Sequence, residues 1–295
     1  MSNKIYLCTT FRDFNGSLND ELQKSFLRSI KEQTYDNFEL VVTMFGEKKV
    51  EENVKEILGD KAFFIDEGKK EYKYSLSTVF LNGMERAKTE KDSILIWSTS
   101  DIVLEQNYFE IIVSNYHHSL AGITHPNHYT DSYSEESKKD SRLGDLLTGI
   151  DILFFSTELL RQEKCRKAIE NYTFYGWGVF ENFLATVGAE NAVKRINTVN
   201  ISNVYKVCND REAANETNTM LNAASMKNFS VFLKYLQAYQ YSDRYRYLLF
   251  CHRKYSILRK NRSYNRMKYR WNKEKMMHSI YCSIPDRLYK LMKRK

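Results

Sequence analysis

The sequence predicts an α/β fold built on a mostly parallel sheet. Residues 4–13 have the pattern of a strand, and residues 29–42 (SIKEQTYDNFELVV) contain a helix end, a polar turn and a second strand. Together they open a strand-helix-strand unit. Residues 93–98 (SILIWS) are nearly all apolar, which is typical of a central strand covered on both faces. Strand and helix patterns alternate between these stretches, as a parallel sheet requires.

The spacing of apolar residues defines the individual elements. In order, we expect strand 5–10, helix 20–33, strand 38–44, helix 48–58, strand 62–65, helix 76–88, strand 93–98, a helix from 106, an apolar run at 120–124, strand 150–156, a helix from 157, a helix starting near 181 and a strand at 193–199. Residues 126–142 are polar, which predicts a mobile loop that is either surface or a lid over a ligand. From 217 the pattern is helical, so we predict a domain at 1–215 and a helical C-terminal region at 216–295.

Length and composition narrow the class of protein. A chain of 295 residues can bury one large core or two modest ones. We expect no membrane-spanning helix and no secretory signal, because long apolar runs are missing and the chain enters a strand directly. The 5 cysteines are odd in number and form no C-x-x-C pair, which predicts reduced thiols in a cytoplasmic protein and disfavours zinc.

Charge is distributed unevenly along the chain. Residues 241–295 hold 17 of the 45 Lys and Arg residues but only 3 of the 37 Asp and Glu residues, so this segment carries a formal charge of +14 against −6 for the remainder. The tail mixes basic with apolar and aromatic residues, which favours a helix lying on an anionic membrane surface. Pairing with a second subunit is the alternative; nucleic acid is disfavoured because no recognised nucleic-acid fold accompanies the tail. We expect a peripheral position on the inner face of the cell membrane.

Polar residues follow two of the predicted strands. Thr9, Thr10 and Arg12 end the first strand, and Ser100 and Asp101 follow the apolar strand at 93–98. Ligands of open α/β sheets bind at the carboxyl ends of the strands. These residues are therefore expected at the edge of a ligand site.

Three segments resemble the inverting glycosyltransferases of family 2, which have the GT-A fold and build bacterial surface glycans. They are residues 29–42, residues 94–110 (ILIWSTSDIVLEQNYFE) and residues 175–182 (YGWGVFEN), and the resemblance covers roughly 4–190. It implies a hexosyltransferase-like enzyme that moves a sugar from a nucleotide-diphosphate donor to a glycan or lipid-linked glycan, in polysaccharide biosynthesis. The rival is a non-catalytic glycan- or membrane-binding protein on the same scaffold. A nucleotidyltransferase is disfavoured because no Gly-rich loop follows the first strand.

The resemblance implies Mg²⁺ or Mn²⁺ at Asp101. Charge builds on the leaving diphosphate, so a divalent cation or cationic side chains must stabilise it. The family has Asp-x-Asp at this point, whereas residues 98–101 read Ser-Thr-Ser-Asp and keep only the last acid. Ser100 is expected beside the donor. An alternative interpretation makes Asp101 a turn residue or a helix cap.

The family also suggests contacts to the nucleotide. Its second strand ends in an acidic pair that is missing here, so recognition is expected to depend on Thr9, Thr10, Arg12 and Asp66. The Asp66 carboxylate suits a base or ribose contact, and the Arg12 guanidinium suits a phosphate. A solvated turn acid and a surface ion pair are the respective alternatives.

The third segment supplies the expected catalytic base. Glu181 would remove the proton of the acceptor hydroxyl, Trp177 would pack against a sugar ring and Asn182 would hold an acceptor hydroxyl. Asp151 is the reserve base. An alternative makes Glu181 a first-turn acid that complements the helix dipole. Four histidines, His117, His118, His125 and His128, lie close together in the sequence, but no nearby Cys or acid completes a convincing set of metal ligands with them.

Overall fold

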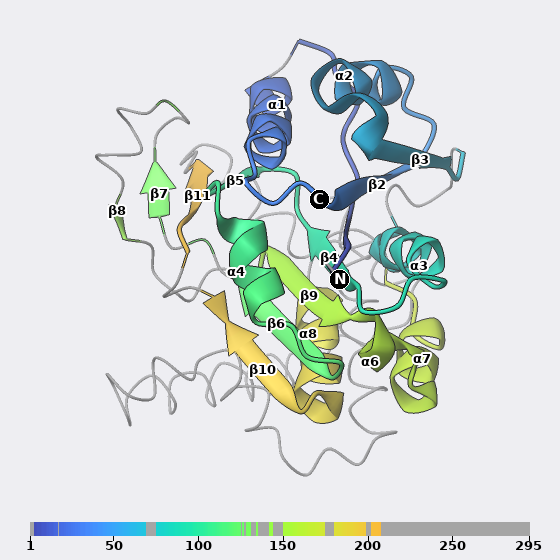
Figure 1. Cartoon of the computed structure of the whole chain (residues 1–295). Helices are drawn as coiled ribbons and strands as arrows, with labels where there is room; N and C mark the ends of the chain where they lie inside the picture. The colour runs from blue at the N-terminus through green and yellow to red at the C-terminus, as the bar shows by residue number, and fades with distance from the viewer. Residues whose placement is uncertain are drawn as a thin grey trace, which may run out of the picture. The chain divides into compact units, whose positions relative to one another are not determined.

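We analysed a computed structural model of the chain (Figure 1). The structure describes residues 3–16, 18–68, 75–124, 126, 128–130, 134, 142–143, 150–174, 180–198 and 202–207. These residues all belong to the first of two compact units, Met1–Tyr235. Most of the predicted loop at 126–142 and the whole helical region after 216 fall outside the described residues. The predicted division into domains and the tail therefore remain predictions, whereas residues 128–130 and 142 of the predicted loop lie in short strands.

A seven-stranded sheet forms the centre of this unit, in the order β10-β6-β9-β4-β1-β2-β3. Its strands are β1 (Ile5–Thr9), β2 (Phe38–Met44), β3 (Ala62–Asp66), β4 (Ile94–Ser98), β6 (Leu120–Thr124), β9 (Ile152–Ser156) and β10 (Lys194–Asn197). The pairs β1–β2, β1–β4, β2–β3 and β10–β6 are parallel, and β9 alone among these strands is antiparallel to its neighbours. The predicted α/β fold with a mostly parallel sheet is confirmed.

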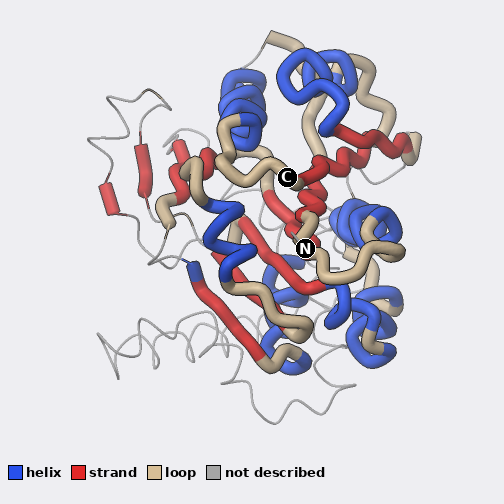
Figure 2. Tube along the Cα trace, viewed as in Figure 1, coloured by secondary structure: helices blue, strands red, loops and turns tan. Residues whose placement is uncertain are grey.

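Helices flank the sheet strands, as Figure 2 shows. They are α1 (Leu18–Lys31), α2 (Val50–Leu58), α3 (Leu76–Arg86), α4 (Tyr108–Ser114), α6 (Thr157–Arg161), α7 (Glu163–Glu170) and α8 (Phe180–Asn191), with a short 3-10 turn at Gly59–Lys61. Helix α3 packs against β1 and β2, and α8 packs against β6 and β9. Each helix expected within the described residues is present, with ends that differ by a few positions. No described helix is long and apolar enough to cross a membrane.

A second, smaller sheet was not predicted. It has the order β5-β11-β7-β8, with strands β5 (Ile102–Leu104), β7 (His128–Thr130), β8 (Arg142–Leu143) and β11 (Val204–Val207) (Figure 1). Strand β11 is antiparallel to β5 and parallel to β7. Each strand has four residues or fewer, and β11 pairs with strands that lie far from it in the sequence. Local apolar periodicity carries little information about such pairings.

Close packing at one glycine fixes the approach of two central strands. Gly122 of β6 pairs with Phe154 of β9. A Cβ atom built on Gly122 would lie 1.9 Å from the Phe154 Cζ atom, so the aromatic ring occupies the space that any side chain would need. Phe154 has no exposed surface. The ring therefore lies flat against the backbone of the neighbouring strand.

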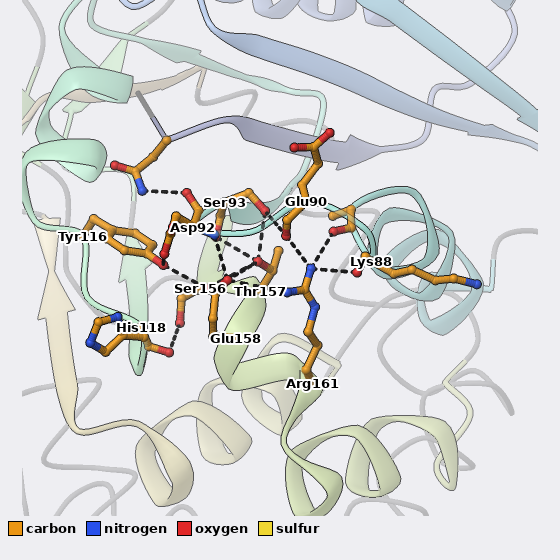
Figure 3. Close-up of polar contacts among 12 residues, drawn as sticks. Lys88, Glu90, Asp92, Ser93, Tyr116, His118, Ser156, Thr157, Glu158 and Arg161 are labelled. Carbon is orange, nitrogen blue, oxygen red and sulfur yellow. Dashed lines mark hydrogen bonds and ion pairs between the residues drawn. The ribbon is translucent and has the colours of Figure 1, made fainter. Parts of the chain in front are cut away.

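A polar network closes one edge of the sheet, where β4 begins and β9 ends (Figure 3). The Arg161 guanidinium of α6 donates to the carbonyl oxygens of Ala87 (3.3 Å), Lys88 (2.7 Å) and Glu90. These carbonyls belong to the turn that follows α3, so one side chain holds this turn against α6. In the same network Glu158 accepts from the backbone amide of Asp92 at 2.8 Å.

Candidate functional site

The carboxyl ends of β1 and β4 meet the start of β9 at the opposite edge of the sheet. Ser98 of β4 pairs with Ile152 of β9. The Thr9 hydroxyl donates to the carbonyl oxygen of Ser98 at 2.8 Å, which ties β1 to β4. The amide of Thr99 donates to the carbonyl oxygen of Asp151 at 3.0 Å. Two segments that the sequence separates by about fifty residues are thus held together by main-chain bonds.

Four titratable side chains gather at this edge, and we call them the acid-lysine cluster: Asp101, Asp151, Glu181 and Lys206. The Lys206 Nζ atom lies 2.6 Å from Asp151 Oδ1 and 3.3 Å from Asp101 Oδ2. The Thr99 hydroxyl also donates to Asp151 Oδ1, at 3.4 Å. One ammonium group therefore binds two carboxylates that reach it from different strand ends.

Exposure differs within the cluster. The side chains of Asp101 and Lys206 are 32% and 27% exposed, whereas that of Asp151 is 7% exposed. The Asp101 side of the ion pair is therefore partly open to a ligand, whereas Asp151 is almost completely covered.

Lys206 and the two aspartates each stabilise the charged form of the other. Burial opposes the charge on Lys206, but the carboxylates of Asp151 and Asp101 outweigh burial and hold the pKa of its ammonium well above the ordinary value. Burial likewise raises the pKa of Asp101, but the charge of Lys206 and a hydrogen bond from Thr99 bring it below the ordinary value. At neutral pH both groups are ionised.

Glu181 is the second residue of α8 and is partly buried. Burial raises the pKa of its carboxyl group to about 7; the nearby charge of Asp151 acts in the same direction, while a backbone hydrogen bond and Lys206 act against it. A carboxyl group that titrates near neutral pH can accept a proton efficiently. Glu181 also lies in the first turn of α8, so the predicted base and the alternative first-turn acid describe the same position. Its role as base stays a prediction.

The described donor set does not fit a divalent cation. A hard cation needs several oxygen ligands, and Asp101 is the only acid of residues 98–101. Its carboxylate is already bound to Lys206, whose positive charge would repel a metal ion at the same point. The described residues contain no group of three or more His, Cys, Asp and Glu side chains that could hold a metal ion. The predicted metal at Asp101 therefore has no support from the geometry and stays untested.

The other predicted nucleotide residues lie at two strand ends. The Thr10 hydroxyl oxygen is buried and has no hydrogen-bond partner among the described residues. The backbone of Arg12 is fixed by Gln23, whose amide accepts from its N–H at 2.7 Å and donates to its carbonyl at 3.1 Å. The hydrogen bond from Thr9 to Ser98 brings the end of β1 next to the end of β4, and Ser100 and Asp101 follow β4.

Asp66 follows a different pattern. Its Oδ1 atom accepts from the backbone amides of Gly46 (3.2 Å) and Gly68 (2.9 Å), so it joins the loops that follow β2 and β3. This geometry agrees with the turn-acid alternative, although it leaves a nucleotide contact untested. Asp101 precedes β5 and not a helix, which excludes the alternative helix cap. Trp177 and the side chain of Asn182 lie outside the described residues.

The histidines do not form a site within the described residues. His117 accepts from the Ser119 amide through Nδ1 at 3.0 Å, and His118 lies in the network at the other edge of the sheet (Figure 3). The ring of His128 packs against Tyr205 at a centroid distance of 5.3 Å. His125 is outside the described residues.

Sequence reasoning missed Lys206. The signal was a single lysine within the apolar stretch VYKV at 204–207, where a buried strand would be expected to carry no unpaired charge. A lysine in such a stretch needs an acidic partner, but the sequence does not say which acid supplies it.

Comparison with known proteins gave similar structures but no family. No protein-family model matches the chain, and no curated protein matches it. Residues 1–349 of S. aureus TarS in complex with UDP-GlcNAc are 13% identical to it, with a TM-score of 0.46, and the match covers 70% of this chain and 59% of that one. GalNAc-T7 with UDP, GalNAc and Mn²⁺ is 11% identical, with a TM-score of 0.45, covering 70% of this chain and 44% of that one. The chain thus spans less than two thirds of either structure.

Proposed function

We propose that this chain is a nucleotide-sugar-dependent glycosyltransferase with a GT-A fold, of the inverting family 2 type. The observation that carries the proposal is the acid-lysine cluster, which combines a carboxyl group with a pKa of about 7 and a fixed cation at the carboxyl edge of a parallel sheet. The three sequence segments that resemble the family support it. The acceptor we propose is a growing surface glycan.

The chemistry divides between the two ends of the cluster. The Glu181 carboxylate takes the proton of the acceptor hydroxyl as its oxygen forms a bond to the anomeric carbon of the sugar. On the opposite side of that carbon, the bond to the diphosphate breaks and its electron pair leaves with the diphosphate. We propose that Thr9, Thr10 and Arg12, near the end of β1, help to hold the nucleotide. The sugar configuration inverts because attack and departure occur on opposite faces.

A donor screen tests this function. The purified chain is incubated with UDP-, GDP-, CMP- and dTDP-sugars, and nucleotide release and ligand binding are measured. We expect binding and slow hydrolysis with one nucleotide class; neither binding nor turnover with any of them would refute the proposal. Glu181→Gln should retain donor binding while transfer is lost, with Glu190→Gln on the same helix as the matched control.

A non-catalytic glycan-binding protein on the same scaffold is the second candidate. The specific observation in its favour is the loss of acids at residues 98–101, which leaves Asp101 alone. This candidate predicts glycan binding that is unchanged in Glu181→Gln, with no nucleotide release from any donor. The enzyme proposal predicts nucleotide release from one donor class and its loss in Glu181→Gln, so nucleotide release separates the candidates.

The basic C-terminal segment supports a position at an anionic membrane surface. Its formal charge of +14 over residues 241–295 is large enough for several basic side chains to contact the surface together, each contributing about 1 kcal/mol. We propose that this segment brings the enzyme to a lipid-linked acceptor. The alternative is that the segment binds a second copy of the chain. Removal of residues 241–295 should weaken binding to anionic vesicles at low salt more than it weakens donor binding; equal vesicle binding with and without the segment would contradict this role.

A further inference from the structure

The position at which this class of enzyme needs a cation is occupied by the Lys206 side chain. We propose that the Lys206 ammonium does the work of the divalent ion: it binds the diphosphate of the donor and stabilises the charge that develops as the diphosphate leaves. The inference rests on the proposed function and makes the reaction independent of added metal. It adds a catalytic residue that the family resemblance does not supply.

The hydrogen-bonding capacity of the ammonium leaves room for the ligand. A lysine ammonium has three N–H donors. Asp151 and Asp101 take two of them, at 2.6 Å and 3.3 Å. The third is left for a phosphate oxygen, because the Lys206 side chain is half-buried and keeps 27% of its surface exposed. The two carboxylates thus orient the ammonium without using all of it.

Main-chain pairing fixes where the ammonium lies. Lys206 of β11 pairs with Ile102 of β5, the residue that directly follows Asp101. The preceding residue Tyr205 donates through its hydroxyl to Glu105 at 2.7 Å, and Val204 is fully buried. The lysine is therefore carried by a strand that pairs with β5 on one side and with β7 on the other, before any ligand is bound. Such preorganisation is what makes a cation effective toward charge that develops in a transition state.

The side chains around Asp101 suit an ammonium group better than a metal ion. A divalent ion at Asp101 would sit against the positive charge of Lys206 and would find only one acid in residues 98–101. The two carboxylates and the ammonium together carry a formal charge of −1, so the cluster acts on the diphosphate at contact distance and not through long-range attraction. Arg12, exposed near the end of β1, supplies positive charge at the same sheet edge.

The step balances without a further reactant. The bond between the anomeric carbon and the diphosphate oxygen breaks, and its electron pair stays on that oxygen. Lys206 donates a hydrogen bond to the leaving group and keeps its proton. The acceptor proton goes to Glu181, so the two groups act on different atoms.

The first test uses the wild-type full-length chain and the donor that the screen selects. Turnover is measured after treatment with EDTA and again after Mg²⁺ or Mn²⁺ is added in excess. We expect less than about a twofold change between these conditions. Loss of turnover in EDTA that either metal restores would overturn the inference and leave the proposed function standing. A wild-type chain that neither binds nor turns over any donor would overturn both.

The second test asks whether Lys206 contacts the diphosphate. Lys206→Gln should lower kcat by about 10²–10³, the usual effect of removing one donor to a developing negative charge. Lys206→Arg, which keeps the charge, should lose less than Lys206→Gln. Lys194→Gln, on another strand, is the matched control for loss of a lysine. Lys206→Gln with wild-type kcat would overturn the inference.

A binding measurement separates contact from a purely structural role. UDP and UMP, or the matching pair for the base that the screen selects, are titrated into wild type and Lys206→Gln in EDTA by calorimetry. We expect the variant to lose at least about tenfold in affinity for the diphosphate and much less for the monophosphate. Equal losses for the two ligands would mean that Lys206 only holds the site together, and would overturn the inference. The EDTA arm on wild type decides the question even where the variant folds poorly.

Discussion

Replacement of Glu181 by glutamine should stabilise the protein in a pH-dependent way. The carboxyl group has an ordinary pKa of 4.5 and a pKa of about 7 in the fold. Its charged form is therefore disfavoured by the folded state, and the free energy of unfolding falls as pH rises from about 4.5 to about 7. A tenfold change in proton affinity corresponds to about 1.4 kcal/mol, so ionisation of Glu181 costs the fold about 3 kcal/mol at pH 8.5 and about 1 kcal/mol at pH 5.

Glutamine keeps the shape of the side chain and removes this cost. The free energy of unfolding of Glu181→Gln, relative to wild type, should therefore increase by about 2–3 kcal/mol between pH 5 and pH 8.5. Urea unfolding followed by circular dichroism at the two pH values measures it. Asp101, Asp151 and Lys206 also titrate, but their effect on stability is the same in both proteins where the substitution does not change their pKa values, so it drops out of the comparison. Glu190→Gln controls for loss of a carboxylate from the same helix. The same stability difference at both pH values would refute the reasoning about burial.

The remaining predictions concern activity and packing. In a pH profile of kcat/KM, donor turnover should fall tenfold for each pH unit below about 7, because Glu181 must be ionised to accept a proton; an acid limb near pH 4.5 would contradict this. Arg161→Lys should lower the free energy of unfolding by about 1–2 kcal/mol, because one amine cannot serve the carbonyls at the end of α3 as the guanidinium does, and Arg166→Lys in urea unfolding is the control. Gly122→Ala should lower it by about 1–3 kcal/mol or more, since the new methyl group would overlap the Phe154 ring; an unchanged melting temperature would show that the ring moves freely.

The large sheet was predictable because its signals are local. Residues 5–9, 38–44 and 94–98 are apolar runs of strand length, and each is bounded by polar turns and separated by helical spacing. Because strands alternate with helices along the chain, the strands can be predicted to lie parallel in one sheet. The direction of β9 was not predictable, because the 152–156 run reads the same whichever way it pairs.

The candidate site was predictable only in part. Thr9 and Asp101 were expected at the carboxyl edge because each lies at or shortly after the end of an apolar strand, and Glu181 was expected at the start of a helix. Lys206 was not, because its partners are set by the pairing of β11 with β5, which joins Lys206 to Ile102 across a long stretch of sequence. Asp66 shows the reverse case: its place after a strand suggested a ligand contact, but its carboxylate binds two loop amides.

The pairing of β11 with β5 also has a consequence for how the site comes into being. Until residues 204–207 join the smaller sheet, the carboxylates of Asp101 and Asp151 lack their shared countercharge. Contacts so distant in sequence close slowly, because the entropy of the intervening chain must be lost first. The large sheet can therefore assemble before the site is electrostatically complete. A nascent or C-terminally shortened chain that ends before β11 would have the large sheet but would lack the countercharge of the acid-lysine cluster.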